Sequence, residues 1–115
     1  MKKSACVCKT AELMHAIDEL EKTLYLIPSS WKVRMPDEVD IATAKMVVET
    51  DVKEALNAID GFVEACGISE VQASSLRELL EQAGRIASEK GFTVAQRVVE
   101  DVRKRLTELV CPTGI

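Results

Sequence analysis

Cysteine is the residue type in this chain with the clearest capacity for chemistry. The sequence holds four of them, Cys6, Cys8, Cys66 and Cys111, and the first two form a Cys-x-Cys pair. Four thiolates within reach of one ion make the tetrahedral ligand set of structural zinc, and thiolates also hold iron–sulfur clusters. Cys-x-Cys is a weaker signal than two Cys-x-x-Cys knuckles. Zinc or an iron–sulfur cluster at these four residues is therefore a hypothesis that depends on the fold.

Other uses of the cysteines stay open. Cys66 continues an apolar stripe and could be a buried small hydrophobe, while Cys6 and Cys8 could lie in a loose tail. The same proximity would allow disulfides if the protein meets an oxidant. Lys2 and Lys3 are not followed by a signal-peptide hydrophobic run, and no apolar run reaches the length of a membrane span. The expectation is thus a cytoplasmic protein with reduced thiols.

The longest element that could position these thiols is an amphipathic helix over residues 37–66. Its apolar residues recur at steps of three and four along one face, as a helix that buries one stripe requires. Asp37 or Asp40 begins it, since acidic side chains suit the positive end of the helix dipole, and Gly67 is placed to end it. The stripe consists of Ile41, Ala44, Val48, Val52, Ala55, Ile59, Phe62 and Cys66.

Three shorter helices are predicted beside it. The first runs over residues 11–26, with Thr10 as its N-cap and Pro28 as its stop. The third opens on a capping box of Ser69 and Gln72 and ends at Gly91. The fourth opens on the same device, Thr93 with Gln96, and ends before Pro112.

These elements predict an all-α protein, an antiparallel up-down four-helix bundle with short connections. The predicted organisation is an N-terminal tail (1–9) with the Cys-x-Cys pair, one helical-bundle domain (10–111) and a C-terminal tail (112–115). Because alternate helices point in opposite directions, all four cysteines are expected at the same end of the bundle.

The net charge and the sequence motifs bear on whether the protein binds nucleic acid or catalyses a reaction. A net charge of −4 and a pI near 5.1 argue against a general nucleic-acid binder, and no catalytic motif or catalytic residue is predicted. The segment 63–69 resembles the bend of a helix-turn-helix, but the helix that follows it would present Glu70 and Glu78 against Arg77. A DNA-binding regulator is therefore the second alternative. A Cys-ligated metal or iron–sulfur enzyme or electron carrier is the first.

The leading expectation is a small cytosolic accessory or interaction protein with a metal or redox site at one bundle end. Between Pro28 and Pro36, Trp31, Val33 and Met35 alternate with basic residues, and tryptophan is enriched at interface anchors. These three residues are the predicted partner contact. Self-association could use surplus apolar positions, for which the candidates are Val47, Leu80 and Val99.

Overall fold

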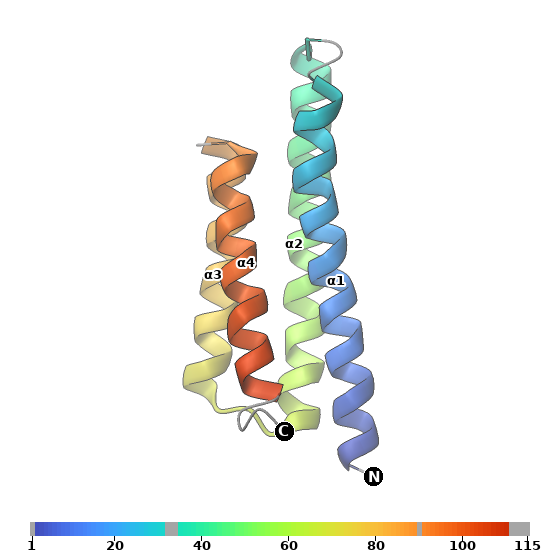
Figure 1. The fold of residues 1–115 in the computed structure, drawn as a ribbon, viewed down its shortest axis with the longest axis vertical. Helices are drawn as coiled ribbons and strands as arrows, with labels where there is room; N and C mark the ends of the chain where they lie inside the picture. The colour runs from blue at the N-terminus through green and yellow to red at the C-terminus, as the bar shows by residue number, and fades with distance from the viewer. Residues whose placement is uncertain (1, 32–34, 90, 111–115) are drawn as a thin grey trace.

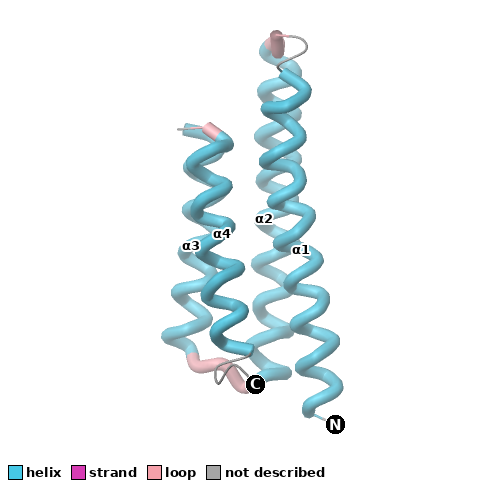
Figure 2. The backbone as a smooth tube through the Cα atoms, viewed as in Figure 1, coloured by secondary structure: helices cyan, strands magenta, loops and turns pink. Residues whose placement is uncertain are grey.

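Four α-helices run alternately up and down and pack as an antiparallel bundle about 50 Å long (Figure 1). The computed structural model describes residues 2–31, 35–89 and 91–110, without the side chains of residues 2–4, 30, 31 and 110. Each helix contacts the two that flank it, so the order around the bundle is α1, α2, α3, α4. All described elements are helices (Figure 2), and they are α1 (Lys2–Trp31), α2 (Glu38–Cys66), α3 (Glu70–Glu89) and α4 (Phe92–Val110).

The ends of α2 and the start of α3 follow the predicted capping signals. The Asp37 side chain accepts a hydrogen bond from the Asp40 amide, and the Asp40 carboxylate accepts one from the Asp37 amide, which completes a capping box. Gly67 ends α2 at φ 65°, in the left-handed region that favours glycine. Ser69 then accepts a hydrogen bond from the Gln72 amide and opens α3.

The core is aliphatic and lies along the bundle axis. Six of the eight residues of the stripe predicted for α2 are buried, from Ala44 to Phe62, and the four described helices confirm the fold class. Among the described residues no polar or charged side chain is buried, and Phe62 is the one buried aromatic ring. The largest fully buried residues of the core are Leu13, Ile17, Leu20, Leu24, Val48, Ile59, Phe62, Leu76, Leu80, Val99, Val102 and Leu106.

The predicted start of the first helix at residue 11 is wrong. Helix α1 begins at Lys2, so residues 2–9, expected as a tail, are helical, and Thr10 lies inside the helix with its hydroxyl donating to the Cys6 carbonyl at 2.7 Å. Nothing in residues 1–27 breaks a helix, because neither glycine nor proline occurs there.

The predicted stop at Pro28 is also wrong, because α1 continues through it to Trp31. Proline has no amide hydrogen, so it cannot donate to the carbonyl of Leu24 four residues earlier. The side-chain amide of Gln96 in α4 donates to this carbonyl at 3.0 Å. Gln96 is thus not used in a capping box with Thr93, which lies within α4.

Polar contacts fix the helices laterally. Arg103 of α4 pairs with Asp18 of α1 and, at 2.8 Å, with Glu21. The hydrogen bond to Asp18 is the main reason that the pKa of the Arg103 guanidinium is raised. Arg77 of α3 donates to Asp60 of α2 at 2.7 Å. These pairs orient α1 against α4 and α2 against α3.

Candidate functional site

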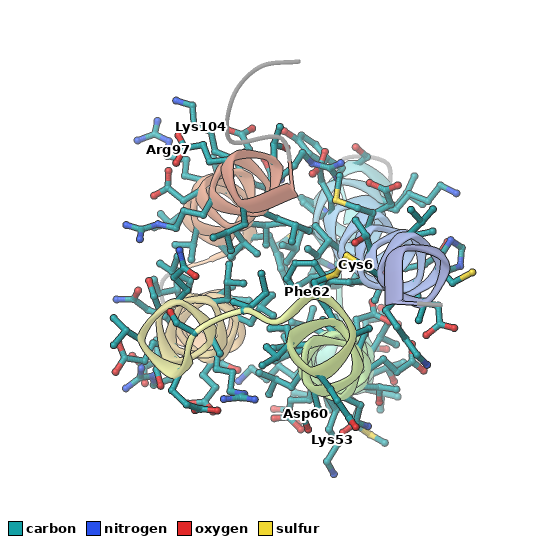
Figure 3. All side chains as sticks on the ribbon, turned by 90° about the horizontal axis from the view of Figure 1, so that it is seen from below. Cys6, Lys53, Asp60, Phe62, Arg97 and Lys104 are labelled. Carbon is teal, nitrogen blue, oxygen red and sulfur yellow. A yellow bond between two sulfur atoms is a disulfide. The ribbon has the colours of Figure 1, made fainter. Side chains whose placement is uncertain are left out.

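The first candidate site is a disulfide between Cys6 of α1 and Cys66 of α2. The two Cα atoms are 4.8 Å apart, although 60 positions separate them in the sequence. Seen from below, Cys6 lies toward the interior of the bundle near Phe62, which is buried at the same end (Figure 3). The prediction that opposite helix directions bring cysteines to one end is therefore met for this pair.

The other two cysteines do not join the pair in the described structure. Cys8 is exposed and unpaired, because two residues along a helix turn a side chain by about 200°. Cys111 lies outside the described residues. Among the described side chains, no group of three or more His, Cys, Asp or Glu is arranged to hold a metal ion. Sulfurs joined to each other are not thiolate ligands, so the zinc or iron–sulfur site stays a prediction for the reduced chain.

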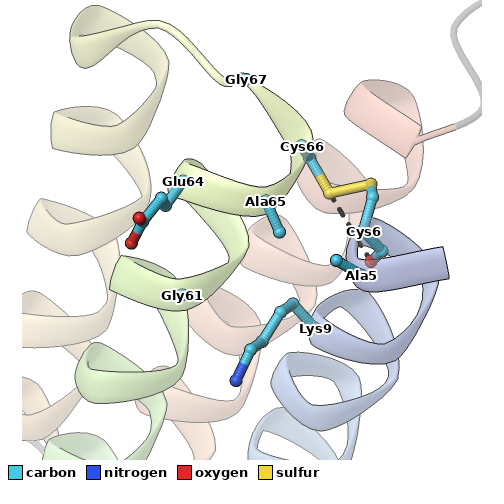
Figure 4. Close-up of a pocket in the computed structure, with 8 residues that line it drawn as sticks. All are labelled: Ala5, Cys6, Lys9, Gly61, Glu64, Ala65, Cys66 and Gly67. Atoms are coloured by element: carbon cyan, nitrogen blue, oxygen red, sulfur yellow. Dashed lines mark hydrogen bonds between the residues drawn. A yellow bond between two sulfur atoms is a disulfide. The ribbon is translucent and has the colours of Figure 1, made fainter. Parts of the chain in front are cut away.

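The disulfide lies in an open groove between the start of α1 and the end of α2 (Figure 4). The aliphatic part of Lys9 crosses Gly61, where an added Cβ would come within 3.1 Å of Lys9 Cδ. The hydroxyl oxygen of Thr10 is 3.9 Å from Cys6 Sγ and 3.7 Å from Cys66 Sγ. Both cysteines are half-buried, so a small molecule in the groove could reach the sulfur atoms.

The second candidate site is at the opposite end of the bundle. Helix α2 is nine residues longer than α3 (29 against 20), and the two are joined at the disulfide end by the short connection 67–69. The α1–α2 pair therefore projects beyond α3 and α4, as Figure 1 shows. We call residues 25–31 and 35–47 the hairpin tip.

Exposed apolar side chains are concentrated at the hairpin tip. Ten large hydrophobic residues are exposed in the described structure, and seven of them lie between residues 25 and 47. Ile41 continues the buried stripe of α2 yet is 39% exposed, because α3 does not extend far enough to cover it. The seven are Tyr25, Leu26, Met35, Val39, Ile41, Met46 and Val47.

Two of the three predicted partner residues, Trp31 and Met35, lie in the hairpin tip. Met35 is 88% exposed. Trp31 is the last residue of α1, without a described side chain, and Val33 lies outside the described residues. Of the surplus apolar positions predicted for self-association, Leu80 and Val99 are wrong, because both are fully buried in the core. Val47 is 40% exposed and belongs to the tip.

Sequence reasoning missed two features. The first is that the apolar face of α1 continues to Cys6, which lies seven residues before Leu13 and shares its face. The prediction missed this because it began the helix at residue 11. It also overlooked Leu26, Val39 and Met46, which are apolar but lie off the stripes. Their signal was their position outside the predicted core, close to Pro28 and Pro36.

Comparison of the chain with models of protein families, with curated proteins and with solved structures found no match. None of the described helices combines the length and the apolar character needed to cross a membrane. The fold defines the protein as an all-α four-helix bundle.

Proposed function

We propose that this protein is a small helical-bundle interaction protein that binds a second copy of itself through the hairpin tip. The observation that carries the proposal is the concentration of exposed apolar side chains at the tip, seven of the ten among the described residues. Clustered apolar exposure is typical of interaction sites, whereas single exposed hydrophobes are ordinary on any surface.

A second copy fits the tip because it supplies the second pair of helices that the tip lacks. At about 1.5 Å per residue, the nine extra residues of α2 project by about 14 Å. Two such projections, related by a two-fold axis and laid side by side, each offer the other a pair of antiparallel helices of equal length. Ile41 of each copy would then be covered as Val48 and Val52 are covered within one chain.

The end of the shorter α3–α4 pair adds apolar surface beside the projecting α1–α2 pair. Phe92 opens α4 and is packed in part against the core, and Val94, two residues later, is 42% exposed. The far end of the projecting pair from the second copy would lie over these residues. The proposed interface thus joins the side of one tip to the end of the other copy's α3–α4 pair.

Sedimentation velocity over a dilution series tests the proposal. The wild-type chain is expected to shift from dimer to monomer on dilution, and Ile41→Glu is expected to be monomeric throughout, because it places a charge in the apolar interface. Val71→Glu is the matched control. It places the same charge near the start of a helix, at an 82% exposed position on the opposite end of the bundle.

Circular dichroism of the three proteins shows whether each variant keeps the helical fold. A wild-type chain that stays monomeric at every concentration would overturn the proposal. A dimer that survives Ile41→Glu and is lost in Val71→Glu would place the interface at the other end and overturn it equally.

A further inference from the structure

We propose that the Cys6–Cys66 pair is a redox-operated latch that decides whether the first three turns of α1, residues 2–12, stay docked on α2. With the disulfide formed, the latch is closed. With two thiols, these turns separate from α2 while the rest of the bundle stays folded. The inference concerns the end of the bundle opposite the hairpin tip and does not depend on self-association.

Apart from the disulfide, few buried contacts hold residues 5–12 of α1 against the bundle. From residue 5 to residue 12 no side chain is buried, and Val7 is 69% exposed. The first buried residue of α1 is Leu13. A helical segment with few buried apolar contacts belongs to the least stable part of a fold and opens locally. The disulfide is therefore the main attachment of these turns.

The face of α1 that packs against α2 changes from large apolar residues to small ones at residues 6–10. Leu24, Leu20, Ile17 and Leu13 face the core at steps of three and four, and the same steps lead back to Thr10 and Cys6. Neither is buried, and each removes less apolar surface from water than a leucine would. On α2, Cys66 continues the stripe after Phe62 and meets Cys6. A covalent bond thus occupies the layer in which a hydrophobic contact would otherwise stand.

The polar contacts that cross to α2 are long and involve sulfur, since Cys66 Sγ is 3.7 Å from Thr10 Oγ1 and 3.6 Å from the Cys6 carbonyl oxygen, so they do not replace the bond. The ion pair of Lys9 joins it to Glu12 at 3.3 Å, and both residues belong to α1. The hydroxyl of Thr10 donates to the Cys6 carbonyl, again within α1. Across to α2, the aliphatic chain of Lys9 rests on Gly61, and a flexible exposed side chain provides a weak contact.

The groove permits the exchange chemistry with a small thiol. A thiolate RS⁻ attacks one sulfur of the pair, the S–S bond breaks, and the other cysteine leaves as a thiolate that takes up a proton. A second RS⁻ attacks the mixed disulfide, which releases RSSR and the first cysteine. In total, the disulfide and two RSH give two cysteine thiols and one RSSR. Thr10 Oγ1 lies within 3.9 Å of both sulfurs, so its hydrogen, which it donates to the Cys6 carbonyl while the disulfide is intact, can turn to the departing thiolate.

Amide hydrogen exchange of the full chain, with Cys8→Ser and Cys111→Ser to leave one pair of thiols, tests the latch. Mass spectrometry without reductant first establishes the bond. Dithiothreitol is then expected to accelerate exchange at residues 6–12 by roughly tenfold or more, and to leave residues 17–24 protected. Adding Cys6→Ser and Cys66→Ser should give the fast exchange without reductant and remove the response to it.

Three results would overturn the latch. The first is a chain that forms no Cys6–Cys66 bond under oxidising conditions. The second is equal protection of residues 6–12 in the oxidised and reduced chain. The third is acceleration of equal size at residues 6–12 and 17–24, because that pattern reports unfolding of the whole bundle rather than release of one segment. None of these measurements involves the hairpin tip, so the proposed dimer and the latch stand or fall separately.

Discussion

Gln96 of α4 donates its side-chain amide to the backbone carbonyl of Leu24 in α1, the acceptor that Pro28 leaves without a helical donor. A proline in a helix interior deprives the carbonyl four residues earlier of its partner, and a carbonyl without a partner is costly where water is excluded. Here the missing donor comes from a residue 72 positions away. The contact also ties α4 to α1 near the base of the hairpin tip.

A double-mutant cycle measures this compensation. Gln96→Leu in the wild-type chain is expected to lower the free energy of unfolding by about 1 kcal/mol, because it leaves the carbonyl without a donor. In a Pro28→Ala background the amide of residue 28 can donate instead, so the same change should cost markedly less. Denaturant unfolding followed by circular dichroism gives both values. Equal costs in the two backgrounds would show that Gln96 does not compensate for the proline.

Asp51 is expected to make stability depend on pH. Burial raises the pKa of its carboxyl above the ordinary 3.8, the hydrogen bond from Thr23 at 2.6 Å lowers it, and Glu54 and Glu19 raise it again. The folded chain therefore holds this proton more tightly than the unfolded chain. The resulting stabilisation is fully present below the unfolded pKa and is lost as pH rises through the folded pKa.

Asp51→Asn keeps an acceptor for Thr23 and removes the charge. We expect it to be as stable as the wild type or more stable at neutral pH, and to flatten the decline in stability above pH 3.8. Thr23→Val removes the hydrogen bond that favours the carboxylate and should steepen the same decline. Urea unfolding at a series of pH values checks both. If the free energy of unfolding rose with pH in the wild type and did not rise in Asp51→Asn, the assigned direction of the pKa shift would be wrong.

Gly61 and Gly67 should respond in opposite ways to alanine. At Gly61 the added Cβ meets the flexible chain of Lys9, which can move, so the higher helix propensity of alanine should stabilise the fold by about 0.5–1 kcal/mol. At Gly67, φ is 65°, and alanine should destabilise it by about 1 kcal/mol although no atom lies within 4 Å of the new Cβ. Thermal unfolding of the two variants gives the comparison, and a shift of the same sign in both would contradict it.

Local signals predicted the number and direction of the helices and most of the buried face of α2, because a period of three and four residues reports which side packs inward. They placed Ile41 in the core and Leu80 on the surface, and the structure reverses both. Asp37, Gly67 and Ser69 ended or began helices as their side chains or backbone freedom suggest. Pro28 was misread because its outcome depends on Gln96, a partner distant in sequence. Thr10 was misread as an N-cap, although no glycine or proline nearby ends the helix that contains it. A rule that considers only the residues around Pro28 contains no information about Gln96.

The candidate sites were predictable only in part. Opposite helix directions place Cys6 and Cys66 at one end, but the face of Cys8 follows from its phase in a helix that sequence reasoning did not extend that far. The hairpin tip depends on α2 being longer than α3, and this difference becomes a surface only when both helices start from a common end. Side chains off the stripes then gather there without any periodic signal.

The disulfide also changes how the chain would carry tension. A force that pulls the two chain ends apart passes from Cys6 to Cys66 through the sulfur atoms, so the intervening 59 residues, within a separation of 60, bear none of it. Only the start of α1 before Cys6 and the chain after Cys66, which contains α3 and α4, then bear the force, and the rest of α1 and α2 does not. In the reduced chain the same force would reach every helix.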